Sequence, residues 1–131
     1  MTVRRLAAWV YWLPAVLWAA TIFVLSSQPW LPGPPGGLTD KHGHVLAFGL
    51  LALACLFGLV GGAWRRVTWR MAALAAAMSI AYGLSDEWHQ SFVPGRMSDL
   101  ADLAADAVGA VVAAGLGWGW AILLRRRDRR S

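Results

Sequence analysis

Ionisable side chains are concentrated in one short stretch of the sequence, SDEWHQSFVPGR, which directly follows the apolar run MAALAAAMSIAYGL. The stretch places two adjacent carboxylates, Asp86 and Glu87, close to His89 and Arg96. Buried carboxylates and histidines act as general acids and bases when their pKa values move towards neutrality. Arginine binds phosphate or carboxylate groups through a pair of parallel hydrogen bonds. This composition predicts acid–base chemistry, recognition of an anionic group, or both.

A second polar group lies in the segment DKHGH, which precedes another apolar run. Asp40, His44 and Phe48 recur at intervals of four residues, which places them on one face of a helix. Lys41 adds a positive charge beside them. His42 lies two residues from His44, so the two rings point in different directions and do not form a pair of metal ligands.

Three aspartates, Asp99, Asp102 and Asp106, follow at spacings of three and four residues and form one stripe on a helix. An acid as far into an apolar helix as Asp106 costs at least a few kcal/mol unless it is paired or hydrated. We therefore expect the stripe to face other helices rather than lipid. An acid within a membrane segment is by default a candidate functional group.

Asp86 and Glu87 need partners for a different reason. They are expected at the C-terminal end of a helix, where the negative pole of the helix dipole disfavours acids. Arg96, Lys41, a histidine or a bound cation would each supply a compensating charge. For Arg96, a salt bridge to Asp86 or Asp99 is the alternative to a role in ligand binding.

Other interpretations of these residues stay open. Asp40 and Asp99 are equally consistent with structural helix caps, since acids near a helix N-terminus gain about 0.3–1 kcal/mol from the dipole. A metal site formed from His44, His89 and the acids matches no established zinc spacing, so no metal ligand and no cofactor is assigned. No nucleophile stands out, because no serine lies in an elbow motif.

Four long apolar stretches must position these groups, because 58% of the 131 residues are hydrophobic and the charges are clustered. A membrane-spanning helix needs about 20 mostly apolar residues. The third stretch is short, so we expect its helix to continue into the polar residues after Leu84. The sequence predicts one all-α domain over residues 1–131, a polytopic membrane protein that forms a four-transmembrane-helix bundle. The stretches cover approximately residues 6–25, 45–62, 71–84 and 103–124.

The positive charges predict an orientation for this bundle. If all four stretches span the membrane, ten arginines lie on one side and only Lys41 and Arg96 on the other. Because positively charged loops remain in the cytoplasm, both termini are expected there, with the polar groups outside. The net charge of +5 flanks the apolar stretches, so it indicates membrane topology rather than nucleic-acid binding. The ten are Arg4, Arg5, Arg65, Arg66, Arg70, Arg125, Arg126, Arg127, Arg129 and Arg130.

The connecting segments contain turn and cap signals. Pro94 and Gly95 are typical of a type II turn, in which glycine supplies the positive φ angle. Ser98 is a suitable N-cap for the last helix, and Thr39 or Asp40 for the second.

The last helix also carries a stripe of small residues. Gly109, Ala113 and Gly117 recur every four residues, which predicts close packing between helices. We expect this stripe to be structural.

Several motifs resemble the VanZ-like family of small bacterial membrane proteins. They are SSQPW, DKHGHVLAFGLLAL and YGLSDEWHQSFVPGRMSDLADLAADAVGAVVAAGLG, so the resemblance runs from about residue 26 to residue 117. The combination of DKxxHxxxF with DExxQxFxPGR makes the match specific. At Asp106 the chain departs from many relatives, which have asparagine there. The resemblance marks Asp40, Lys41, His44, Phe48, Asp86, Glu87, Gln90, Phe92, Pro94, Gly95, Arg96, Asp99 and Gly109.

The resemblance implies a protein of the bacterial cytoplasmic membrane, and the founding member of the family is associated with low-level teicoplanin resistance. We expect a site at the outer face that acts on or binds an anionic envelope or lipid-linked molecule, with altered glycopeptide susceptibility as one consequence. The candidate catalytic residues are Asp86, Glu87, His44, Asp40 and Asp99. The candidate substrate-binding residues are Arg96, Lys41, Gln90 and His89, and the candidate structural residues are Pro94, Gly95 and Gly109.

A non-catalytic module that binds a membrane lipid or a cell-wall precursor is the main alternative to an enzyme. A transporter or proton relay fits less well, because a transport pathway should carry polar groups through the full depth of the membrane. Beyond Asp106 the apolar stretches offer only Tyr11, Thr21, Cys55 and Ser79. The oligomeric state is left open.

Overall fold

The computed structural model describes residues 8–33 and 35–130, and this part of the chain contains helices and no strand. The all-α prediction is therefore confirmed. The elements are α2 (Leu13–Ser26), α3 (Asp40–Leu59), the short 3₁₀ helix η1 (Trp64–Arg66), α4 (Trp69–Gln90) and α5 (Leu100–Asp128).

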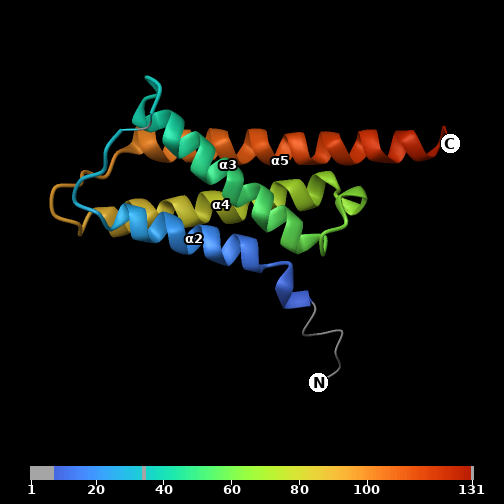
Figure 1. Ribbon diagram of the computed structural model, residues 1–131, viewed down its shortest axis with the longest axis horizontal. Coiled ribbons are helices and arrows are strands. Elements are labelled where there is room, and N and C mark those ends of the chain that lie inside the picture. The colour runs from blue at the N-terminus through green and yellow to red at the C-terminus, as the bar shows by residue number, and fades with distance from the viewer. Residues whose placement is uncertain (1–7, 34, 131) are drawn as a thin grey trace.

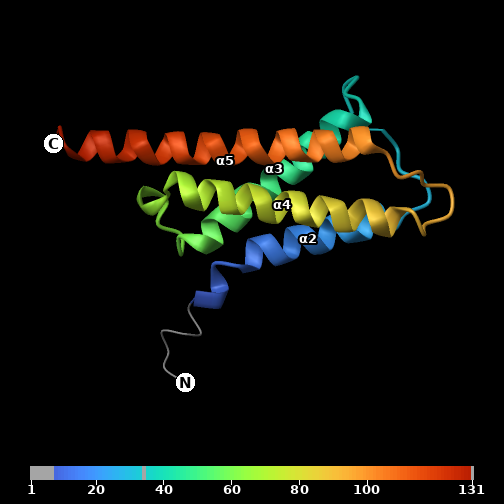
Figure 2. The same ribbon diagram turned by 180° about the vertical axis from the view of Figure 1, so that it is seen from behind.

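The four long helices run in alternating directions, so the connections before α3 and before α5 lie at the same end of the bundle (Figure 1). These connections are residues 27–39, between α2 and α3, and residues 91–99, between α4 and α5. η1 and the C-terminal end of α5 lie at the opposite end. α5 packs against α3 and α4, and α2 covers the other side of the same two helices (Figure 2). The end with the two connections, called the polar end below, is where the predicted site residues lie.

Three helical segments among the described residues are long and apolar enough to cross a membrane: Ala8–Ser26, Asp40–Val60 and Leu100–Asp128. α4 is also long enough, with 22 residues, but its last two turns carry the polar stretch that begins at Ser85. The predicted four long helices are all present, and three of them have the composition of a membrane span.

The first helix differs from its predicted form, because α2 begins only at Leu13. The chain before it is helical at residues 8–10 and then turns at Tyr11 and Trp12. Pro14 lies at the start of α2 and lacks the N–H that would continue a helix through this point. Outside the described residues lie Arg4, Arg5 and Leu6.

α3 and α5 approach each other closely where both helices present glycine. A Cβ atom on Gly109 would collide with the backbone carbonyl of Val45. A Cβ atom on Gly49 would lie 3.1 Å from the carbonyl oxygen of Gly109. Farther along α5, a Cβ atom on Gly117 would come within 2.8 Å of Leu56. The small residues of α5 thus let the two backbones touch close to the polar end.

Two side-chain hydrogen bonds attach α2 to its neighbours. The indole Nε1 of Trp18 donates to the carbonyl oxygen of Ala47 on α3 at 2.8 Å. The hydroxyl of Tyr82 on α4 donates to the carbonyl oxygen of Ala19 at 2.6 Å. Because the bilayer core contains no water to replace these partners, each bond fixes the position of α2.

We expect Tyr82→Phe to lower the free energy of unfolding by about 1 kcal/mol, the usual contribution of one intramolecular hydrogen bond. The aromatic ring would keep its packing, so only the bond to Ala19 is lost. Unfolding of the purified protein in detergent, followed by circular dichroism, measures the change. Tyr11→Phe is the matched control, because the Tyr11 hydroxyl has no hydrogen-bond partner within the described part of the chain. An equal loss in both variants would contradict the role of this bond.

The helix starts at the polar end confirm one predicted cap and correct another. Thr39 is the N-cap of α3, and its backbone N–H donates to Nδ1 of His42 at 3.0 Å. The predicted N-cap of α5 was wrong: Asp99, not Ser98, occupies this position, and its carboxylate accepts a backbone N–H of the first turn. The reason is that the Ser98 hydroxyl donates its hydrogen bond to the carboxylate of Glu87.

Candidate functional site

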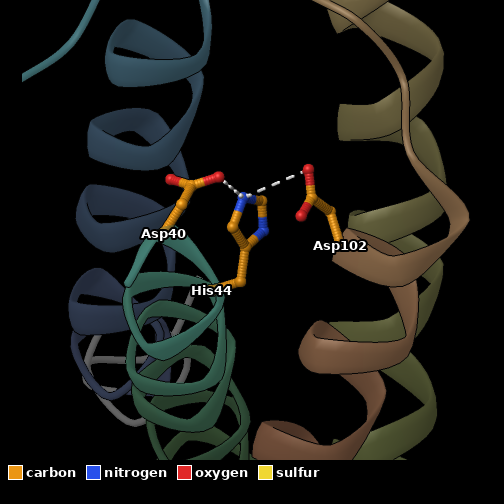
Figure 3. A group of neighbouring side chains, drawn as sticks. All are labelled: Asp40, His44 and Asp102. Atoms are coloured by element: carbon orange, nitrogen blue, oxygen red, sulfur yellow. Dashed lines mark ion pairs between the residues drawn. The ribbon is translucent and has the colours of Figure 1, made fainter. Parts of the chain in front are cut away.

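His44 lies at the centre of the polar end, between α3 and α5. Its Nε2 atom is 3.8 Å from Oδ2 of Asp40, one turn earlier, and 3.8 Å from Oδ2 of Asp102 on α5 (Figure 3). Its Nδ1 atom is 2.8 Å from Oδ1 of Asp106, a fully buried residue. The imidazole also stacks nearly parallel to the ring of Phe48, with the centroids 6.3 Å apart. Both ring nitrogens therefore face carboxylates.

Lys41 links the start of α3 to the start of α5. Its ammonium group forms ion pairs with Asp99, at 3.0 Å, and with Asp102. The backbone N–H of Ala101 and then the ammonium of Lys41 hold the pKa of Asp99 below its ordinary value. Asp99 is thus kept ionised as a cap and an ion-pair partner.

Glu87 is buried at the end of α4, and its environment explains how an acid is tolerated there. Its Oε2 atom accepts hydrogen bonds from the Ser98 hydroxyl at 3.0 Å and from the backbone N–H of Asp99 at 2.9 Å. The positive end of the α5 dipole therefore offsets the unfavourable end of the α4 dipole. The second oxygen, Oε1, is buried and has no hydrogen-bond partner among the described residues.

Asp86 and Gln90 are buried one turn apart on α4, which continues past Leu84 as predicted and ends at Gln90. The Nε2 group of Gln90 donates to Oδ2 of Asp86 at 2.9 Å and to the hydroxyl of Ser26 on α2 at 3.4 Å. The amide that the sequence marks for substrate binding thus also orients Asp86. Ser26 itself was not anticipated as part of the site, because a serine at the end of an apolar helix resembles an ordinary helix terminus.

His89 lies apart from this cluster. Its Nε2 atom is 3.0 Å from the hydroxyl of Ser27, and its ring stacks on Phe23 with the centroids 4.5 Å apart. Both partners belong to the end of α2 and the residue after it. The structure therefore places His89 at the contact between α4 and α2, and not beside His44.

Arg96 is held by the turn that Pro94 and Gly95 form. Gly95 has a φ angle of 83°, and the backbone N–H of Arg96 donates to the carbonyl oxygen of Val93 at 3.1 Å, which closes the turn. The guanidinium group makes no ion pair or side-chain hydrogen bond with any residue that the structure describes. The alternative salt bridge to an acid of the site is thus not formed.

A cavity of about 280 Å³ opens between α2, α3, α4 and the connections at the polar end. Apolar side chains of α2, α3 and residues 31–32 form most of its wall. The polar lining is Ser26, Asp40, His44, Asp86, Gln90 and Arg96.

The site thus combines residues that lie far apart in the sequence. Asp102 and Asp106 complete the surroundings of His44, and their spacing along one helix face was the signal for them. Two groups of three residues bring one ligand atom each to within 4.8 Å of one another, a separation that a metal ion could bridge. They are His44 with Asp40 and Asp102, and His44 with Glu87 and Asp106.

The comparisons with known proteins point to one family. The VanZ/LLP1 family profile matches residues 10–124, which include every residue of the cluster around His44 and of the cavity. Neither the curated proteins nor the solved structures gave a significant match. Together with the membrane-spanning composition of its helices, this match over most of the chain shows a membrane protein that belongs to the VanZ/LLP1 family.

Proposed function

We propose that this protein uses the cavity at the polar end to bind or to modify an anionic envelope molecule that carries an apolar chain. The observation behind this proposal is the composition of the cavity, which joins an apolar wall to an arginine without an ion-pair partner in the described part of the chain. Ligand sites are mostly apolar with a few convergent polar groups. A lipid-linked phosphate has both the hydrocarbon and the anion that such a cavity would take.

Arg96 is the group that would hold the anion. Its planar guanidinium offers two parallel donors to a phosphate, and the turn at Gly95 fixes the backbone from which it extends. Lys41 is already paired with Asp99 and Asp102, so it contributes by positioning these acids.

The proposed orientation places the cavity at the outer face of the membrane, outside the cytoplasm. The end of the bundle opposite the cavity carries the arginines of η1 and of the last turn of α5. There Arg65 pairs with Asp128, and Arg125 donates to the carbonyl oxygen of Val67 at 3.0 Å. Positively charged segments favour the cytoplasmic side, which supports cytoplasmic termini.

Two versions of this function differ in whether chemistry follows binding. Asp86, Glu87 and His44 are the candidate acid–base groups of an enzyme, and the acids on both sides of His44 favour this version because they orient the ring. The hydrogen bond between Gln90 and Asp86 favours a non-catalytic module, because it engages both side chains with each other. Arg96 would then make the main contact with a ligand. An effect on glycopeptide susceptibility would follow from either version.

The test is lipid binding by Arg96 variants. We expect purified wild-type protein to retain a polyprenyl phosphate in preference to phosphatidylcholine, as measured by native mass spectrometry. Arg96→Gln should weaken this binding by roughly 10- to 100-fold, since hydrogen bonds to a charged group contribute about 1.5–3 kcal/mol. Arg96→Lys keeps the charge but loses the paired donors, so its affinity should be intermediate.

The control is Arg126→Gln, which removes an exposed arginine at the other end of α5. It should leave the affinity unchanged. Equal affinity in the wild type and Arg96→Gln would contradict the proposal. Mass analysis of the lipid after incubation separates the two versions, because an enzyme changes the lipid and a binding module returns it intact.

A further inference from the structure

We propose that His44, Glu87 and Asp106 bind a divalent transition-metal ion of the Zn²⁺ type. The three residues come from α3, α4 and α5, so the site would join three helices at the polar end. One ligand atom of each lies within 4.8 Å of the others. Because each ligand is on a different helix, no zinc spacing would be visible in the sequence.

Two unsatisfied oxygens point to an ion at this position. Oε1 of Glu87 and Oδ2 of Asp106 are both buried without a hydrogen-bond partner among the described residues. The exposed fractions of the two residues are only 6% and 0%. Leaving a buried acceptor without a partner costs about 1–3 kcal/mol, and more for a charged group. A cation between these carboxylates would satisfy both oxygens at once.

The donor set fits a transition metal. One imidazole nitrogen and two carboxylate oxygens are ligands that zinc accepts, and three protein ligands leave one position open for water or a ligand oxygen. Imidazole disfavours Mg²⁺ and Ca²⁺, which prefer oxygen ligands alone. His44 faces Asp106 with Nδ1 and two further acids with Nε2. Metal-binding histidines commonly donate their second ring nitrogen to a carboxylate, which orients the ring.

The alternative group, His44 with Asp40 and Asp102, fits less well (Figure 3). Asp102 is already neutralised by its ion pair with Lys41. The side chain of Asp40 is 76% exposed, and neither acid has a buried oxygen without a partner in the described residues. These two acids are better placed to hold the ring of His44 than to hold the ion.

The ion would also change the charge of the cavity. The polar end contains six acidic residues, whereas its basic residues are Lys41, Arg96 and the histidines. His44 lines the cavity, so an ion bound to it would add positive charge next to Arg96, where an anion is to be held. The role of the ion in anion binding rests on the proposed function. The position of the ion rests only on the side chains of His44, Glu87 and Asp106.

The experiment is metal binding by the purified protein in detergent, after treatment with a chelator and without added lipid. Zn²⁺ should bind at one equivalent per chain in isothermal titration calorimetry and should raise the melting temperature. Loss of a residue that only supports a metal ligand weakens metal binding roughly 10–100-fold. Glu87→Gln removes a direct ligand, so it should weaken Zn²⁺ binding by more than this. Asp86→Asn is the matched control, because it neutralises the adjacent buried carboxylate, which belongs to neither group of three.

Three outcomes would overturn the inference: no Zn²⁺ binding by the wild type, an equal loss in Glu87→Gln and Asp86→Asn, or a loss only in Asp40→Asn and Asp102→Asn. If Glu87→Gln does not fold, X-ray absorption of the Zn²⁺-loaded wild type decides. It should show one imidazole and carboxylate oxygens around the ion, and a shell without imidazole refutes the site. Because no lipid is present, this result is independent of the Arg96 test.

Discussion

Gly109→Ala is expected to prevent the native packing of α3 against α5 and to reduce the yield of folded protein sharply. The new Cβ atom would collide with the carbonyl oxygen of Val45 and lie 2.8 Å from its carbonyl carbon and Cα. These are backbone atoms, so no side-chain rotation relieves the collision, and the helices must move apart. We expect a loss of more than about 3 kcal/mol, above the usual range for overpacking.

Gly115→Ala is the matched control, since it adds the same methyl group to the same helix. A Cβ atom at Gly115 has no neighbour within 4 Å. This variant should be neutral or slightly stabilising, because alanine favours helix more than glycine does. Yield after membrane extraction, elution in size-exclusion chromatography and detergent unfolding measure both variants. Equal stability of Gly109→Ala and Gly115→Ala would show that the two backbones are not in contact.

The second large effect is expected at Asp106, where two substitutions should act in opposite directions. Asp106→Leu removes the partner of the His44 Nδ1 atom inside the bundle, which should cost about 3–5 kcal/mol, as for other broken buried pairs. Asp106→Asn keeps an oxygen for His44 and replaces an unpartnered oxygen by an NH₂ donor. Without added metal, we expect Asp106→Asn to be more stable than the wild type, because a neutral amide costs less to bury than a carboxylate with an unpartnered oxygen.

The response to Zn²⁺ separates stability from function at Asp106. The wild type should gain stability when Zn²⁺ is added, and Asp106→Asn should not, because it lacks the charged ligand. Thermal unfolding with and without 1:1 Zn²⁺ measures both effects in the same samples. A wild-type-like gain in Asp106→Asn would contradict the role of Asp106 as a ligand, and lower stability of this variant without metal would contradict the unsatisfied oxygen.

The helical architecture could be predicted because each element has its own local pattern. Long uncharged stretches predict helices. The third stretch is short, so its helix was expected to continue into the polar residues after Leu84. The break before α2 was missed, because an apolar composition hides the effect of Pro14 on the hydrogen-bond ladder. The N-cap of α5 was assigned to the wrong residue, because propensity alone does not show that Ser98 is already bonded to Glu87.

The residues of the candidate site could be named from the sequence, but how they are arranged could not. Helical spacing placed Asp102 and Asp106 on one face, and the dipole argument required a partner for Glu87. That the partner is the backbone N–H of Asp99 depends on how two helix ends meet, which no local pattern encodes. The same holds for His89, whose type suggests chemistry but whose neighbours are Ser27 and Phe23.

If α5 crosses the membrane as proposed, the length of its uncharged part sets the depth of Asp106 and of the neighbouring cavity. The 18 residues from Ala107 to Leu124 separate Asp106 from the arginines of the last turn and span roughly 27 Å at 1.5 Å per residue. The hydrocarbon core is about 30 Å thick, so in the proposed orientation Asp106 would lie close to its outer boundary, near the lipid headgroups. The proposed ligand, a lipid phosphate, would be confined to that same thin layer, which would give it a high effective concentration at the site. Occupancy would then follow the surface density of the lipid, and even a weak intrinsic affinity would suffice.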